Sequence, residues 1–258
     1  MQANPKSLAD VLRSADRFVI PEYQRPYCRT NEEVEQLWSD LFESYREESA
    51  ASSPAEDAYF LGPIVVAKQQ SKTGDYAAVV DGQQRLTTLH ALLWCGWHRL
   101  AEADGDGRAL RDRLERFLTT TSDSATLGVA RADQPNFLAI QKATPLDEER
   151  PLGAAGVALR KHFGQLDGLP EVIGFLQHVL SRAQFILVET ESYASAWDLF
   201  IGLNGKGRPR VVPSTPPIPS RHTCVEKART RRRPPTFGRS ASCRWGATRP
   251  ARCWTSSA

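Results

Sequence analysis

Two segments of opposite character meet near residue 207, and only the first can build a hydrophobic core. Residues 208–258 contain eleven Arg and one Lys against a single acid, a net charge of 12 − 1 = +11. Removing them from the totals of 33 basic and 30 acidic residues leaves 21 and 29 in residues 1–207, a net charge of −8. The second segment also holds eight of the 17 Pro and shows neither helical nor strand periodicity. We therefore predict a folded domain over residues 1–207, followed by a disordered, basic tail rich in Arg, Pro and Ser over 208–258.

Three interpretations of the basic segment stay open. It is an arm that binds phosphates, a solvated linker, or the out-of-frame translation of a GC-rich gene. Trp245 and Trp254, scattered among Arg and Ser, favour the out-of-frame interpretation, because linkers usually exclude large aromatic residues. On that interpretation the first domain is truncated near residue 207 and incomplete at its C-terminal end.

The composition also limits the class of protein. No apolar run approaches the ~18 residues of a membrane span, and the first ten residues lack the apolar core of a signal peptide. Five Cys is an odd number without disulfide-framework spacing. We therefore expect a cytoplasmic protein without a membrane partner.

The periodicity of residues 1–207 predicts an α+β fold, a small sheet with surrounding helices. Thr30 and Glu33 have the spacing of a capping box ahead of an apolar stripe that runs from Val34 to Tyr45. Two apolar runs joined by a polar turn predict a β-hairpin over 62–80, and a long helix follows it. Further helices are expected at 8–12, 108–118, 133–142, 155–165, 171–182 and 193–203, further strands at 17–20 and 185–190, and a loop at 119–128.

The sequence DGQQR, residues 81–85, lies between the second strand of this hairpin and the long helix. The first amides of a helix are unpaired and carry partial positive charge, which suits a phosphate. Gly82 permits a tight turn, and Arg85 adds a planar fork of donors. Gln83 and Gln84 can contact a ligand or orient an attacking water, and Asp81 can cap the helix or hold Mg²⁺ through water. In the plainer interpretation Asp81 is a cap, Gly82 a turn and Arg85 a surface ion-pair partner, and spacing alone leaves both open.

Two other segments offer polar side chains that can converge on this junction. Gln24 and Arg25 lie in a Pro-bounded loop after a strand, where a second guanidinium can bind an anion. The alternative is a turn whose Tyr23 and Tyr27 pack on the core. Phe200 and Asn204 are four residues apart at the end of the last expected helix, where Asn204 equally fits a C-terminal cap.

Taken in order, IPEYQRPY, EEVEQLWSDL, YFLGPIVV, VVDGQQRLTTLHALL and LFIGLNGKG resemble the N-terminal domain of GmrSD-type restriction endonucleases. The resemblance covers roughly residues 5–207 and implies a ParB/sulfiredoxin-like fold. The motifs of that family are QR, DGQQR and FxxxN. One departure is Arg29, which stands where relatives usually carry an aromatic residue.

The resemblance implies a module that binds and hydrolyses a nucleoside triphosphate with Mg²⁺, in a modification-dependent, type IV-like restriction system of phage defence. Carried over, Asp81, Gln83 and Gln84 are expected to be catalytic. No metal ligand is assigned, although Asp81 can hold Mg²⁺ through water. The residues expected to bind the nucleotide are Gln24, Arg25, Gly82, Arg85, Phe200 and Asn204.

DNA cleavage by this chain alone is not expected, because its five His form no nuclease-like cluster. We therefore expect DNA to be engaged only through a separate or lost nuclease domain. One alternative is a non-enzymatic, ParB-like DNA-binding or scaffold module, although the net charge of −8 disfavours broad DNA affinity. Another is an inactive, truncated gene product. The sequence leaves the choice of nucleotide, the DNA modification and oligomerisation open.

Overall fold

The computed structural model describes residues 5–50, 59–71, 74–120 and 124–204. All of them lie within residues 1–217, the first of the two units into which the chain divides. The predicted basic tail lies outside the described residues, so its predicted disorder stays a prediction.

One mixed sheet organises the described part of the chain. Its six strands follow the order β1-β6-β3-β4-β2-β5, in which β3 pairs antiparallel with β4 and parallel with β6. The antiparallel pair is the predicted hairpin. The strands are β1 (Pro5–Ser7), β2 (Phe18–Val19), β3 (Tyr59–Ser71), β4 (Gly74–Asp81), β5 (Leu127–Gly128) and β6 (Ala183–Thr190).

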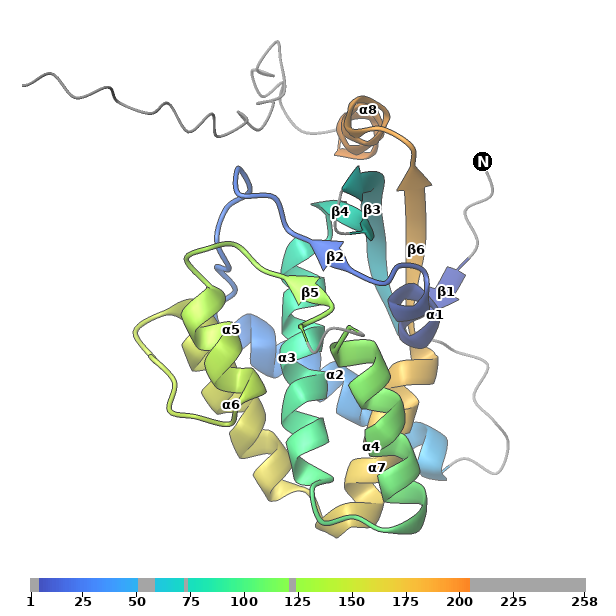
Figure 1. The fold of residues 1–258 in the computed structure, drawn as a ribbon. Helices are drawn as coiled ribbons and strands as arrows, with labels where there is room; N and C mark the ends of the chain where they lie inside the picture. Colours follow the sequence, from blue (N-terminus) through green and yellow to red (C-terminus); the bar gives the residue numbers. More distant parts are fainter. Residues whose placement is uncertain (1–4, 51–58, 72–73, 121–123, 205–258) are drawn as a thin grey trace, which may run out of the picture. The chain divides into compact units, whose positions relative to one another are not determined.

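Eight helices accompany the sheet in these described residues. Most of them lie below the sheet in Figure 1, and α3 runs through the middle of that group. One helix, α8, lies apart from the others against β3, β4 and β6. The helices are α1 (Leu8–Arg13), α2 (Asn31–Ala50), α3 (Gln83–Arg99), α4 (Gly105–Leu118), α5 (Gln134–Gln141), α6 (Pro151–Gln165), α7 (Gly168–Arg182) and α8 (Tyr193–Asn204).

The predicted capping box starts α2. The backbone N–H of Thr30 donates to Glu33 Oε2 at 2.8 Å, and the N–H of Glu33 donates to Thr30 Oγ1 at 3.3 Å. The helix then buries Val34, Trp38 and Leu41 of the predicted apolar stripe. Reciprocal capping satisfies two amides that have no partner within the helix, so sequence alone fixes where α2 begins.

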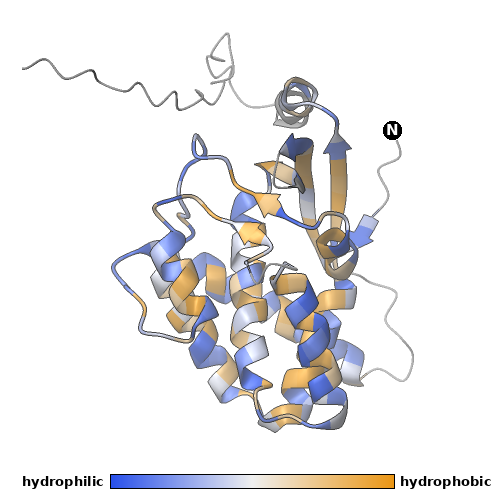
Figure 2. Cartoon of the chain, viewed as in Figure 1, coloured by the Kyte–Doolittle hydropathy of each residue, from blue (hydrophilic) through white to orange (hydrophobic). Residues whose placement is uncertain are grey.

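Helix α3 is buried almost all round from Gln83 to Gly96. At Gly96 an added Cβ would lie 2.5 Å from Leu176 Cδ2 and 3.1 Å from Phe163 Cζ, so side chains of α6 and α7 pack close against this point of α3. Figure 2 shows apolar residues on the facing sides of the helices and hydrophilic residues on their outer sides. Because its neighbours hold α3 on every side, the N-terminal end of this helix is a fixed point of the fold.

The sheet separates two hydrophobic clusters. Successive residues of β3 alternate between them, with Ile64 in the main core and Val65 in the smaller cluster. The smaller cluster also contains Val80 and Ala196, and Trp197 packs against it. Helix α8 therefore covers the face of the sheet that the other helices leave open.

The structure confirms an α+β arrangement and corrects its details. Strand β1 was not predicted, and β5 lies inside the expected 119–128 loop. Both are short and sit at the two sheet edges, where pairing depends on distant partners rather than on their own pattern. The ParB/sulfiredoxin likeness stays an expectation from the resemblance. Among the described residues, no helix has the length and apolar character needed to cross a bilayer.

Candidate functional site

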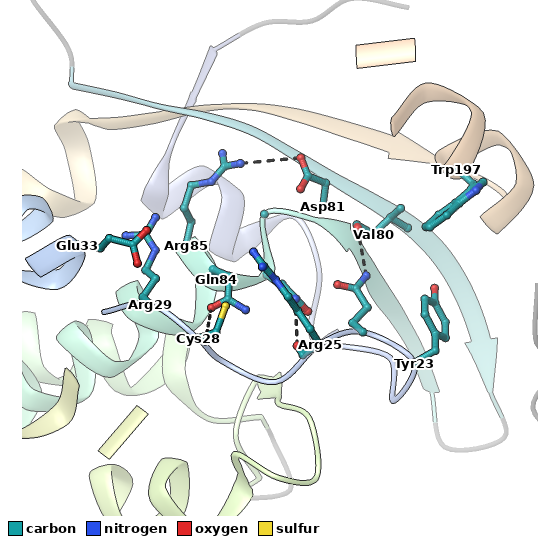
Figure 3. A pocket seen from close by; sticks show the side chains of 13 residues that line it. Tyr23, Arg25, Cys28, Arg29, Glu33, Val80, Asp81, Gln84, Arg85 and Trp197 are labelled. Atoms are coloured by element: carbon teal, nitrogen blue, oxygen red, sulfur yellow. Dashed lines mark hydrogen bonds and ion pairs between the residues drawn. The ribbon is translucent and has the colours of Figure 1, made fainter. Parts of the chain in front are cut away.

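A cavity of about 830 Å³ opens where β4 ends and α3 begins. Three separate stretches line it: residues 23–33, which run from the loop into the first turn of α2, the junction 80–85, and Trp197 of α8 (Figure 3). Arg25 and Arg85, which are 60 residues apart in sequence, therefore face one hollow. The predicted convergence of the QR and DGQQR segments is present in the fold.

The junction itself differs from the expected cap. Asp81 is the last residue of β4, and the N-cap of α3 is Gly82, whose φ of +88° lies in the left-handed region that favours glycine. No side chain caps this helix, so Asp81 does not play that part. The first helical hydrogen bond runs from Leu86 N to Gly82 O at 3.0 Å. The amides of residues 83–85 therefore precede the helical ladder, as an anion site requires.

Arg85 is bound to the fold as well as to the cavity. Its Nη1 donates to Leu61 O at 2.9 Å and to Pro63 O at 2.7 Å, while its Nη2 lies 3.9 Å from Asp81 Oδ2. Gly62 has a φ of +96°, and a Cβ there would lie 2.6 Å from Arg85 Nη1. Burial lowers the pKa of Arg85, although the Asp81 carboxylate opposes the shift. One edge of the guanidinium therefore holds the start of β3, which leaves Nη2 on the side of Asp81.

The three predicted glutamines hold the 24–28 loop. Gln24 Nε2 donates to Val79 O at 2.7 Å, and Gln83 Nε2 donates to Arg25 O at 3.1 Å. Gln84 Nε2 donates to Pro26 O at 3.3 Å, and its Oε1 accepts from Cys28 N at 3.0 Å. Gln83 differs from Gln84 in that its Oε1 is buried and bonds to no other protein atom of the described chain. Side-chain amides thus fasten the loop to the strand and helix that border the cavity.

Tyr27 anchors the same loop from below. Its ring is 4 % exposed, its hydroxyl lies 2.9 Å from Thr88 Oγ1, and its N–H donates to Asp133 Oδ2 at 2.8 Å. Burial raises the pKa of Tyr27 to about 12 and also raises the pKa of Asp133. Of the two tyrosines that the plainer interpretation placed on the core, Tyr27 packs there, whereas Tyr23 is 48 % exposed.

Three arginines, Arg25, Arg29 and Arg85, and two carboxylates, Glu33 and Asp81, line the cavity. Arg25 is exposed and Arg29 half-buried, and Arg29 makes no hydrogen bond or ion pair within the described part of the chain. Arg29 is close enough to Arg85 to add to the lowering of its pKa, after burial. The three arginines and the two carboxylates, Asp81 and Glu33, together give the lining of the cavity a net charge of +1. Sequence reasoning did not assign Arg29, and its departure from the family pattern was the one available signal.

The opposite end of the cavity is aromatic. Tyr23 and Trp197 lie there in Figure 3, and the Tyr23 ring meets Tyr193 edge-on with centroids 6.4 Å apart. No motif pointed to Trp197. Of the predicted FxxxN pair, Phe200 and Asn204 lie on α8 by their backbone, but their side chains are outside the described residues, so their roles stay predictions.

The donor set fits a metal ion only in part. Within the described ranges, no group of three or more His, Cys, Asp or Glu side chains gathers where it could hold one. Mg²⁺ at nucleotide sites, however, usually needs one or two carboxylates beside the phosphates and water. Asp81, half-buried and lining the cavity, fits that smaller requirement.

The model of the GmrSD restriction endonuclease N-terminal domain matches residues 8–209. The chain belongs to this family. This match confirms the resemblance to a restriction endonuclease family. All residues that line the cavity lie inside the matched range. No curated protein matches the chain.

Proposed function

We propose that this GmrSD N-terminal domain binds a nucleoside triphosphate with Mg²⁺ in the cavity between β4 and α3, and hydrolyses it. The observation that carries the proposal is the convergence of Arg25, Arg29 and Arg85 beside the uncapped start of α3. A triphosphate is a compact polyanion, and guanidinium forks together with free helix amides are the groups that bind one. Residues 1–207 carry a net charge of −8, so a local positive excess in the cavity favours a small anion that enters it over a long polyanion such as duplex DNA.

The roles of the polar residues follow from which of their atoms are already bonded. Both ends of the Gln84 amide hold the loop, so Gln84 positions the site. Gln83 donates to Arg25 O and keeps a buried, unbonded acceptor oxygen next to the helix start; a small side-chain rotation that opens this oxygen to the cavity would let it orient an attacking water. Asp81 would hold Mg²⁺ through water, and the ion would neutralise phosphate charge. Hydrolysis then relies on fixed charges around the phosphates rather than on a covalent intermediate.

In this proposal the domain is the regulatory module of a modification-dependent restriction system that acts in phage defence. Nucleotide turnover in the cavity would license cleavage by a nuclease domain. The membership in a restriction endonuclease family supports this context.

The test is titration calorimetry of the full chain with each of the four ribonucleoside triphosphates and Mg²⁺, followed by phosphate-release assays. Arg29→Gln is the informative variant, because Arg29 makes no bond in the described structure that its loss would break. We expect it to weaken binding by about 1.5–3 kcal/mol, the value of a hydrogen bond to a charged group.

Arg46→Gln is the matched control, since Arg46 is an exposed arginine of α2 whose ion pair with Glu171 spans 3.5 Å. It should bind like the wild type. Absence of binding heat for all four triphosphates would refute the proposed function, and sequence-selective binding of duplex DNA instead would favour the ParB-like alternative.

A further inference from the structure

The cavity has two chemically different ends. Arg29, Glu33 and Arg85 lie at one end, and Tyr23 and Trp197 lie at the other (Figure 3). A site for phosphate alone needs only the charged end. An aromatic pair at the far end of the same hollow therefore needs an explanation of its own.

Trp197 is held from behind. It packs against the small cluster that contains Val65 and Val80 on the second face of the sheet, and it also lines the cavity. The helix that carries it starts at a well-formed cap, because Ser192 Oγ accepts from Ser195 N at 3.2 Å. A ring fixed in this way loses little conformational entropy when another ring stacks on it.

Tyr23 stands at the mouth of the same end. Its ring remains 48 % exposed although it meets Tyr193 edge-on, and it follows Pro21 in a loop that Gln24 ties to β4. An exposed aromatic ring on a fastened loop is a contact surface that needs no large rearrangement to form.

We propose that the aromatic end is the nucleobase subsite, with Trp197 as the stacking platform and Tyr23 as its rim. This deepens, and rests on, the proposed function. The ligand then lies in one direction only, with its base against Trp197 and its phosphates toward Arg29 and Arg85. A nucleotide is the ligand class that joins a planar ring to a polyanion in one molecule, as the two ends require.

The experiment separates the two ends by comparing GTP with inorganic tripolyphosphate, which has no base. Both are titrated with Mg²⁺ into the full-length wild type, Trp197→Leu and Trp197→Phe. Base stacking on an aromatic side chain predicts that Trp197→Leu weakens GTP binding about 5- to 150-fold. Its tripolyphosphate affinity should stay within about twofold of the wild type, and Trp197→Phe should recover most of the GTP affinity.

Tripolyphosphate binding also reports whether Trp197→Leu still folds around the charged end. If the wild type binds tripolyphosphate as tightly as GTP, the base subsite does not exist. The same conclusion follows if Trp197→Leu changes neither affinity, or if it lowers both equally while circular dichroism shows that the variant is folded. A wild type that binds neither probe would refute the proposed function itself, and the inference with it.

Discussion

Replacing Arg85 by Ala should lower both the stability of the fold and the affinity for the ligand, and the two effects can be measured separately. Arg85 Nη1 donates to two carbonyl oxygens at the start of β3, at 2.9 and 2.7 Å. A hydrogen bond from a charged donor contributes about 1.5–3 kcal/mol, and losing the donor leaves both carbonyls without it. The Asp81 pair at 3.9 Å adds less than about 1 kcal/mol.

The carbonyls of Leu61 and Pro63 are only partly shielded, so water replaces some of what is lost. We therefore expect Arg85→Ala to lower the free energy of unfolding by about 2–4 kcal/mol, less than the sum of two full bonds. Loss of one charged hydrogen bond to the ligand should weaken binding by about 1.5–3 kcal/mol, which raises the Kd roughly 10- to 150-fold. Arg85→Lys keeps the charge but not the planar fork, so it should recover part of the affinity and less of the stability.

Urea unfolding followed by circular dichroism gives the first quantity, and calorimetry with GTP, under conditions where the variant is folded, gives the second. Arg46→Ala serves as control and should lower stability by less than about 1 kcal/mol, since its ion pair is exposed. A loss below about 0.5 kcal/mol in Arg85→Ala would refute the idea that this side chain fastens β3. If Arg85→Ala loses the expected stability but binds GTP as tightly as the wild type, Arg85 does not contact the ligand.

Two further predictions concern the loop and the helices. Gln84→Leu removes the bonds to Pro26 O and Cys28 N, so amide exchange across residues 24–28 should accelerate in mass spectrometry, and unchanged exchange would contradict the anchoring role. Hydrogen bonding from Arg182 lowers the pKa of Glu48 below its ordinary 4.5, so Glu48 contributes stability above that pH and loses it as pH falls through the lowered value. Glu48→Gln should thus be less stable than wild type at pH 7, with the gap closing as the pH falls below 4.5 and through the lowered pKa, and a pH-independent gap in urea unfolding would show that the charge is irrelevant.

The parts of the fold that sequence predicted are those whose cause is local. The capping box of α2 and the β3–β4 hairpin depend on residues a few positions apart, and both are present. Gly82 was expected in a turn, and Asp81 was one candidate for the cap because Asp is a common capping side chain. The structure has Gly82 itself at the N-cap, and its left-handed φ of +88° has no sequence signal beyond the glycine.

The rest of the site depends on long-range pairing. Arg85 finds its acceptors on Leu61 and Pro63, and backbone carbonyls carry no sequence signature. Trp197 reaches the cavity because β6, a strand more than 100 residues from β3, pairs parallel with it and delivers α8 to the second face of the sheet. Arg29 was visible only as an exception to the family pattern. Residues that line one cavity from three distant stretches cannot be grouped by periodicity or spacing.

The same bonds bear on how the DGQQR segment can be tested. Gln83, Gln84 and Arg85 each bond to the loop or strand that encloses the cavity. Replacing any of them therefore disturbs the shape of the cavity as well as the contacts to the ligand. Lost activity in such a variant therefore does not separate a catalytic residue from a positioning one. Arg29 makes no hydrogen bond or ion pair in the described structure, so its side chain can be replaced without disturbing the segments that enclose the cavity. An effect of Arg29→Gln on triphosphate binding is for that reason stronger support for a phosphate site than a larger effect at Arg85.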